Sequence, residues 1–142
     1  MQLKYHACFT LIAALLLAGC SSPPGKPATM QALPECGWLP NCVNSESGRG
    51  AQASKPLRAD AQGWQKLKAW IARQEDWEIT VDEGNFMQAV VKTPMVGFRD
   101  DVQLLFISDD QLIQVRSSSR LGISDMNTNA RRVETLRDQL AP

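Results

Sequence analysis

Residues 102–119 read VQLLFI-SDDQ-LIQVRSSS, two apolar runs separated by four turn-forming residues. The pattern predicts two antiparallel strands, from Val102 to Ile107 and from Leu112 to about Ser119. The short turn also fixes how the strands pair. With Ile107 opposite Leu112, Gln103 lies opposite Arg116, and two residue pairs nearer the open end Asp101 lies opposite Ser118.

Side chains alternate between the two faces of such a hairpin, and the two faces differ in character. One face is apolar, and we expect helices to cover it; it carries Val102, Leu104, Phe106, Ile113 and Val115. The other face is polar at one end and apolar at the other. That mixture is compatible with the floor of a groove or with a half-covered sheet surface. This second face carries Asp101, Gln103, Leu105, Ile107, Leu112, Gln114, Arg116 and Ser118, with Arg120 added if the strand continues.

The segments around the hairpin complete an α+β pattern. Asp60 is a suitable N-cap for a helix over residues 61–74, in which Trp64 and Leu67 follow helical spacing. Period-two alternation then predicts strands over residues 77–81 and 86–93, and a last helix runs over about residues 127–140. We therefore predict a four-stranded antiparallel sheet, with the N- and C-terminal helices packed on one face.

The N-terminal residues have the pattern of an export signal. An apolar run from Ala7 ends at Leu17-Ala18-Gly19-Cys20 and is too short to span a membrane. The tetrapeptide resembles the lipobox of bacterial lipoproteins, which implies that residues 1–19 are a signal peptide and that Cys20 is lipidated. Two or three acyl chains would make a lasting membrane anchor. By the same resemblance, Ser21 in place of aspartate implies the periplasmic face of the outer membrane.

We expect residues 20–35, which are rich in Pro and Ser, to be a lipidated tether, and residues 36–142 to form a single domain. A second stretch without periodicity, residues 45–55, is predicted to be a long loop. Cys36 and Cys42 remain as a pair after processing, and in an oxidising compartment they predict a disulfide that pins the loop before the fold. A metal site at this pair lacks further ligands, because His6 is removed with the signal peptide. We therefore expect no metal and no cofactor.

Composition excludes several classes of function. Without Lys4, the mature chain carries 14 Lys and Arg against 15 Asp and Glu, which gives no basic surface for nucleic acid. Without histidine or a free thiol, it has no Ser-His-Asp triad, no Cys-His dyad and no histidine zinc site. Asp100 and Asp101 are neighbours on a predicted strand and should point to opposite faces, so they do not flank one bond.

One polar constellation remains as a candidate site. Arginines, serine hydroxyls and the start of the last helix could bind a carboxylate, phosphate or sulfate. Alternatively, Asp101 and Asp125 neutralise Arg116 and Arg120 in a buried network that holds the following loop on the sheet. A third interpretation is a protein-binding surface. All three interpretations use the same residues, namely Asp101, Arg116, Ser118, Arg120, Asp125, Asn129, Arg131 and Arg132.

Several short motifs of this sequence occur together in one known protein family. They are Cys36 with PNCV at 40–43, GFRDD at 97–101, RSSSRLGISD at 116–125 and NARR at 129–132. Together they resemble an uncharacterised bacterial family, domain of unknown function 1499, over essentially everything from Cys36 onward. Asn127 departs from the glycine expected there, although asparagine also tolerates positive φ. The resemblance implies small secreted or lipid-anchored proteins and no established activity.

From these observations we expect a lipid-anchored envelope protein that acts as a non-catalytic binding or scaffolding module. Its partners would be the membrane, through the anchor, and an envelope protein or a cell-wall component. The alternative is a small periplasmic hydrolase that uses carboxylate, serine and arginine groups. A closed arginine network would favour the module, whereas an open cleft with an unpaired carboxylate would favour the enzyme.

Overall fold

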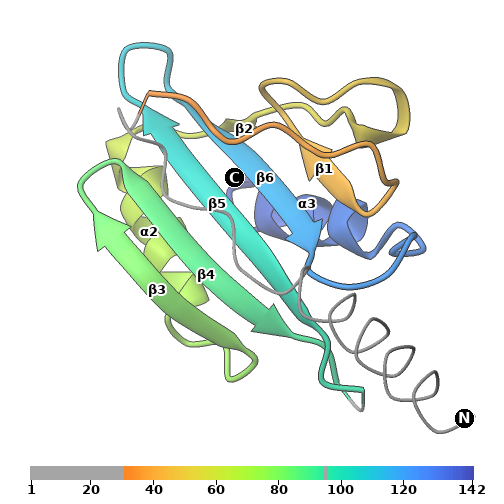
Figure 1. Cartoon of the computed structure of the whole chain (residues 1–142). Coiled ribbons are helices and arrows are strands. Elements are labelled where there is room, and N and C mark those ends of the chain that lie inside the picture. The colour runs from red at the N-terminus through yellow and green to blue at the C-terminus, as the bar shows by residue number, and fades with distance from the viewer. Residues whose placement is uncertain (1–30, 95) are drawn as a thin grey trace, which may run out of the picture.

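The predicted hairpin forms the middle of the sheet (Figure 1). The computed structural model describes residues 31–94 and 96–142, so the predicted signal peptide, Cys20 and most of the predicted tether lie outside the described residues. Strands β5 (Arg99–Ile107) and β6 (Leu112–Ser119) pair antiparallel. Ile107 lies opposite Leu112, and Gln103 lies opposite Arg116. The register predicted from the turn is therefore confirmed.

Two further strands extend the sheet on the β5 side. They are β3 (Trp77–Glu83) and β4 (Phe86–Lys92), in the order β5-β4-β3. Strand β5 begins three residues earlier than the apolar pattern indicates because Lys92 of β4 pairs with Arg99. This extension places Asp100 and Asp101 inside the sheet, where both are buried.

The prediction of four strands is wrong, because the sheet has six. Two short strands, β1 (Cys42–Asn44) and β2 (Leu57–Arg58), pair antiparallel with the other edge of β6. Runs of three and two residues are too short to show a period-two pattern. The segment between them, expected to be a plain loop, contains the 3-10 helix η1 (Gly50–Gln52) and a parallel bridge from Asn44 to Ala53.

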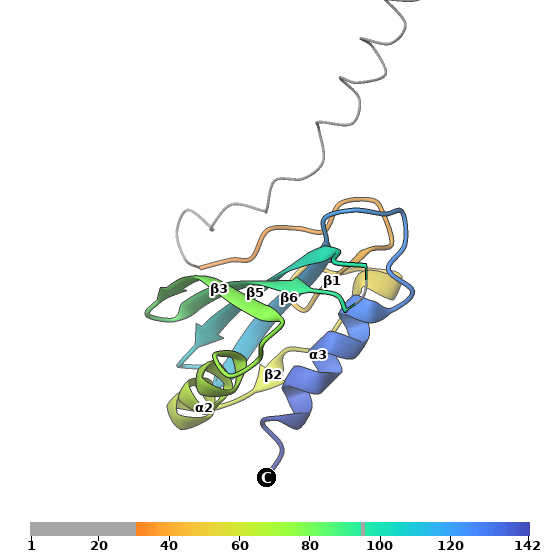
Figure 2. The same ribbon diagram turned by 90° about the horizontal axis from the view of Figure 1, so that it is seen from below.

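Two helices, α2 (Ala61–Ile71) and α3 (Thr128–Asp138), cover one face of the sheet (Figure 2). The Asp60 side chain accepts a hydrogen bond from the backbone N–H of Gly63 at 2.8 Å, which confirms the predicted N-cap. Both helices end earlier than predicted. The core between helices and sheet contains the whole predicted apolar face of the hairpin, namely Val102, Leu104, Phe106, Ile113 and Val115, together with Trp64, Leu67, Ile71, Val133 and Leu136. Within the described residues, neither helix is long and apolar enough to cross a bilayer.

The opposite face of the sheet is covered by the segment that leads into β1, as Figure 2 shows. Leu33 packs there on Phe86 and Leu105 in a second, smaller core. The polar end of the same face is also buried, including Asp101, Gln103 and Arg116. Of the two alternatives left open by the sequence, this face is thus a covered surface.

The predicted disulfide joins Cys36 to Cys42, with 5.8 Å between their Cα atoms. Hydrogen bonds join its loop to the rest of the domain, two of them to η1 and to the segment after β6. The side chain of Gln52 donates to the carbonyl of Leu39 at 2.9 Å, and the side chain of Asn41 donates to the carbonyl of Gly122 at 2.7 Å. The disulfide therefore stiffens a loop that bridges η1 and the segment after β6.

Removing this disulfide should lower stability moderately. Closing so short a loop contributes about 2 kcal/mol in the chain-entropy model, so a Cys36→Ser/Cys42→Ser variant should melt roughly 10 °C lower. Thermal unfolding followed by circular dichroism, with and without reductant, measures the effect. Reductant should bring the wild type down to the melting temperature of the variant and leave the variant unchanged. An equal reductant effect on both proteins would contradict the assignment.

Candidate functional site

Two clusters of paired charges lie at the end of the sheet where β5 begins and β6 ends. They start from neighbouring carboxylates. Asp100 points to the helix side and bonds Arg132, whereas Asp101 points to the other face and bonds Arg120. The expectation that these two carboxylates do not flank one bond agrees with this geometry. We call the two clusters the helix-side network and the outer-face pair.

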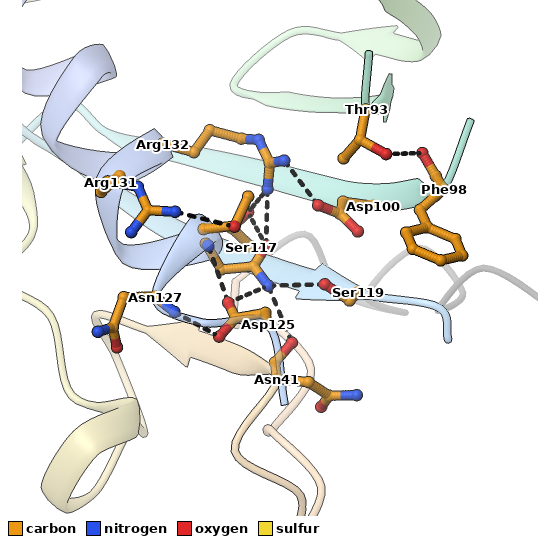
Figure 3. A network of polar contacts seen from close by, with 12 residues as sticks. Asn41, Thr93, Phe98, Asp100, Ser117, Ser119, Asp125, Asn127, Arg131 and Arg132 are labelled. Carbon is orange, nitrogen blue, oxygen red and sulfur yellow. Dashed lines mark hydrogen bonds and ion pairs between the residues drawn. The ribbon is translucent and has the colours of Figure 1, made fainter. Parts of the chain in front are cut away.

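The helix-side network is centred on Arg132, which reaches from α3 to the sheet (Figure 3). Nη2 of Arg132 donates to Oδ2 of Asp100 at 2.6 Å, and the two side chains are 8% and 3% exposed. Nη1 donates to Oγ of Ser117 at 2.8 Å and to Oδ1 of Asn129 at 2.7 Å. A buried charge pair is stable only when its remaining polar atoms are also bonded, and these contacts provide that.

Asn129 extends the network to the loops, and its side chain is fully buried. Its Nδ2 donates to the carbonyl of Asn41 and to Oγ of Ser119, both at 3.0 Å, and to Oδ2 of Asp125 at 2.6 Å. Asp125 also accepts from the backbone N–H groups of Asn129 at 2.8 Å and Asn127 at 3.1 Å. Asn129 thereby joins the disulfide loop, β6 and the start of α3.

The turn before α3 uses the conformation that the sequence anticipated. Asn127 has φ of 65°, in the left-handed region where asparagine substitutes for glycine. Arg131 is exposed and donates from Nη1 to the carbonyl of Met126 at 2.9 Å and from Nη2 to Oγ1 of Thr128 at 3.2 Å. Arg131 therefore stabilises the turn through hydrogen bonds on the protein surface and is not part of the buried network.

The outer-face pair differs from the predicted pairing. Arg120 donates from Nε and Nη2 to the two oxygens of Asp101 at 2.9 and 2.8 Å. The hydrogen bond that Arg120 donates to Asp101 raises the pKa of Arg120. Asp125, expected to neutralise an arginine, instead binds backbone and amide N–H groups at the start of α3. Asp101 thus pairs with Arg120 through two hydrogen bonds, and the expected direct bond to Arg116 is not formed.

The pairing with Arg120 follows from one added rung of the ladder. The backbone N–H of Arg120 donates to the carbonyl of Arg99 at 3.1 Å, so the strand geometry continues one residue beyond β6. Residues 116, 118 and 120 then share a face with Asp101. Ser118 lies directly opposite Asp101 in the register.

Arg116 is buried, with 7% of its surface exposed. Its Nε and Nη1 atoms have no hydrogen-bond partner among the described residues. Burial lowers the pKa of Arg116, and the nearby charge of Asp101 partly offsets that effect. Arg116 is therefore the one member of the predicted constellation whose buried donors stay unused within residues 31–94 and 96–142.

Sequence reasoning missed four members of the helix-side network as site residues, namely Asn41, Asp100, Ser117 and Ser119. The signal for two of them was present. Asp100 shares the alternation of Val102, and Ser117 that of Val115, so both are polar groups on the face that the helices cover. Such groups need partners from a helix, and Arg132 and Asn129 of α3 provide them. The partners of Asn41 depend on the conformation of the loops, which the hydrophobic periodicity of the sequence does not predict.

A hollow of about 260 Å³ adjoins the helix-side network. Asp100, Ser119 and Asp125 contribute to its wall. Its remaining lining is mostly apolar and includes Phe98, Leu121 and Met126, which are all exposed. No group of three or more potential metal-ligating side chains is found in the described part of the chain.

These features define a small α+β domain whose loop end is held together by a disulfide and buried ion pairs. The chain belongs to the family described as protein of unknown function (DUF1499), whose model matches residues 32–140. No curated protein and no solved structure gives a significant match to the chain.

Proposed function

We propose that this protein is a lipid-anchored component of the bacterial envelope and acts as a non-catalytic binding module. The contact surface is the loop end, formed by residues 36–42, 93–99 and 120–127. The observation that carries this proposal is the distribution of charge and apolar surface at that end. Four charged side chains of the motifs bond one another inside the domain as the pairs Asp100–Arg132 and Asp101–Arg120, and large apolar side chains lie outside.

The pairing of the charges argues against the hydrolase alternative. A general acid or base needs a carboxylate that can exchange a proton with a substrate. Asp100 is bonded by Arg132, and Asp101 is bonded through both oxygens by Arg120. The arginine hydrogen bonds hold both carboxylates in one geometry and occupy the oxygens that a substrate would need. This arrangement supports a structural role for both carboxylates.

A second candidate function is favoured by one observation. The unpartnered Nε and Nη1 atoms of Arg116 could donate hydrogen bonds to a bound anion, as planar guanidinium groups do to phosphate and carboxylate. The burial of Arg116, which is only 7% exposed, argues against this function. An anion would reach Arg116 only if the groups that cover it moved.

The membrane anchor rests on the LAGC tetrapeptide at residues 17–20. In cells fed labelled palmitate, the wild type should carry label and fractionate with membranes. Cys20→Ala should lose the label and remain an unprocessed precursor. Cys8→Ala is the matched control, because Cys8 lies within the predicted signal peptide, and this variant should stay labelled. A soluble wild-type protein with an unmodified N-terminus would refute the anchor.

A further inference from the structure

Six large apolar side chains are exposed in the described residues, and all six belong to the loop end. We call them the apolar tip. Trp38 and Met126 are the most exposed, at 90% and 83%. The full set is Trp38, Val96, Phe98, Leu121, Ile123 and Met126. Exposed apolar groups gathered in one region of a domain indicate a contact surface.

Three separate loops supply the apolar tip. The connections from β4 to β5 and from β6 to α3 leave the same end of the sheet, because β4 and β6 both run antiparallel to β5. The disulfide loop joins them there through the bond from Asn41 to the carbonyl of Gly122. The helix-side network, the outer-face pair and the disulfide hold the bases of these loops. The apolar side chains are therefore presented on a rigid support.

The charges around the apolar tip are compatible with an anionic lipid surface. The three loops contain few charged residues, and two of these residues, Arg120 and Asp125, are bonded inside the domain.

Basic side chains lie next to the apolar tip. Arg99 is exposed beside Phe98, and Lys92 pairs with Arg99 across the strands. Arg131 is bonded to the carbonyl of Met126. The backbone N–H of Lys92 donates to the carbonyl of the acidic residue Asp76 at 2.8 Å. Basic side chains beside Trp, Phe and Leu are typical of segments that lie in the membrane interface.

The length of chain before the domain allows the apolar tip to reach the membrane that holds the anchor. Leu33 packs on Leu105, and the six residues from there to Arg99 span about 20 Å of strand. The loop beyond adds roughly 10 Å. From Cys20 to Leu33 the chain can extend to about 43 Å at 3.3 Å per residue. The contour length therefore exceeds the distance that the chain must cover.

We propose that the apolar tip inserts into the surface of the lipid bilayer, so that the domain rests on the membrane by its loop end. The bilayer in question is the one that carries the Cys20 lipid, and this inference therefore rests on the proposed anchor. A lipid anchor and an apolar contact together bind a membrane more firmly than either one alone.

The test uses the full mature chain and vesicles of phosphatidylethanolamine and phosphatidylglycerol with brominated acyl chains, which quench tryptophan at short range. Trp38 should be quenched, and its emission should shift to shorter wavelength. The contribution of Trp38 is obtained by subtracting the signal of Trp38→Phe, which retains Trp64, Trp70 and Trp77.

Charge placed in the apolar tip should abolish this signal. Ile123→Asp/Met126→Asp should lose the quenching of Trp38. Ser108→Asp/Gln111→Asp is the matched control, because it adds the same charge to exposed positions in the β5–β6 turn, at the other end of the sheet. The control should be quenched like the wild type. Circular dichroism verifies that both variants are folded.

The outcomes separate this inference from the anchor. Flotation with vesicles without quenching of Trp38 would overturn the membrane contact and leave the anchor standing. Quenching of Trp38 in a chain with an unmodified N-terminus would support the contact and overturn the anchor. Protection of Trp38 that depends on protein concentration and not on lipid would overturn the contact in favour of a second copy of the chain.

Discussion

Arg132→Met is expected to lower the free energy of unfolding by roughly 3–5 kcal/mol, the typical effect of removing one partner of a buried ion pair. The variant leaves Asp100, which is 3% exposed, without its cation. It also removes the donor that serves Ser117 and Asn129. Methionine keeps much of the side-chain volume, so the loss reports the charge and its hydrogen bonds. Urea unfolding followed by circular dichroism measures the effect.

The neighbouring arginine provides the control for this experiment. Arg131 occupies the same helix, but it is exposed, and its side chain bonds the carbonyl of Met126 and the hydroxyl of Thr128 at the start of α3. Arg131→Met should therefore change stability by about 1 kcal/mol or less. If both variants shifted the urea midpoint equally, the helix-side network would have no special contribution to stability.

Arg120→Met is expected to have the second-largest effect, about 3 kcal/mol. The variant removes both hydrogen bonds to the buried carboxylate of Asp101. The effect should be smaller than that of Arg132→Met, because Arg116 stays close enough to act on the charge of Asp101. The double variant Arg120→Met/Asp101→Asn should recover part of the loss, since contacting groups are non-additive.

Arg116→Met is the matched comparison on the same strand and face. It removes a buried cation whose Nε and Nη1 atoms have no partner among the described residues, and it leaves the Asp101–Arg120 pair intact. Replacement of a poorly compensated buried charge by an apolar side chain is often neutral or stabilising. The loss should be below about 1 kcal/mol. A larger loss from Arg116→Met than from Arg120→Met would show that Arg116 is the true partner of Asp101.

The hairpin and its two faces could be predicted from the sequence because local rules determine them. The four-residue turn fixed the pairing of Ile107 with Leu112, and alternation then placed every side chain on its face. The N-cap at Asp60 and the left-handed turn at Asn127 are also local features. Strands β1 and β2 were missed because each is a strand only by virtue of its pairing with β6. A segment of two or three residues has no sequence pattern that predicts such pairing.

The candidate site was anticipated in its composition and only partly in its pairing. Arg120, Asp125, Asn129 and Arg132 of the predicted constellation make buried or partly buried polar contacts, but Asp101 was assigned to Arg116 and Asp100 was left out. Whether Arg120 reaches Asp101 depends on one additional ladder bond after β6. The bond between Arg132 and Asp100 joins groups 32 residues apart and depends on how α3 packs against the sheet. Neither is encoded in a periodic pattern.

Arg120 and Arg132 bond the protein's own carboxylates, and we propose that the loop end makes its contacts through apolar side chains. Calorimetric titration of the wild-type protein with inorganic phosphate at low ionic strength distinguishes this arrangement from an anion site. We expect no saturable heat of binding at millimolar phosphate. Saturable binding that is lost in Arg116→Met and kept in Arg131→Met would contradict it and would establish an anion site at Arg116.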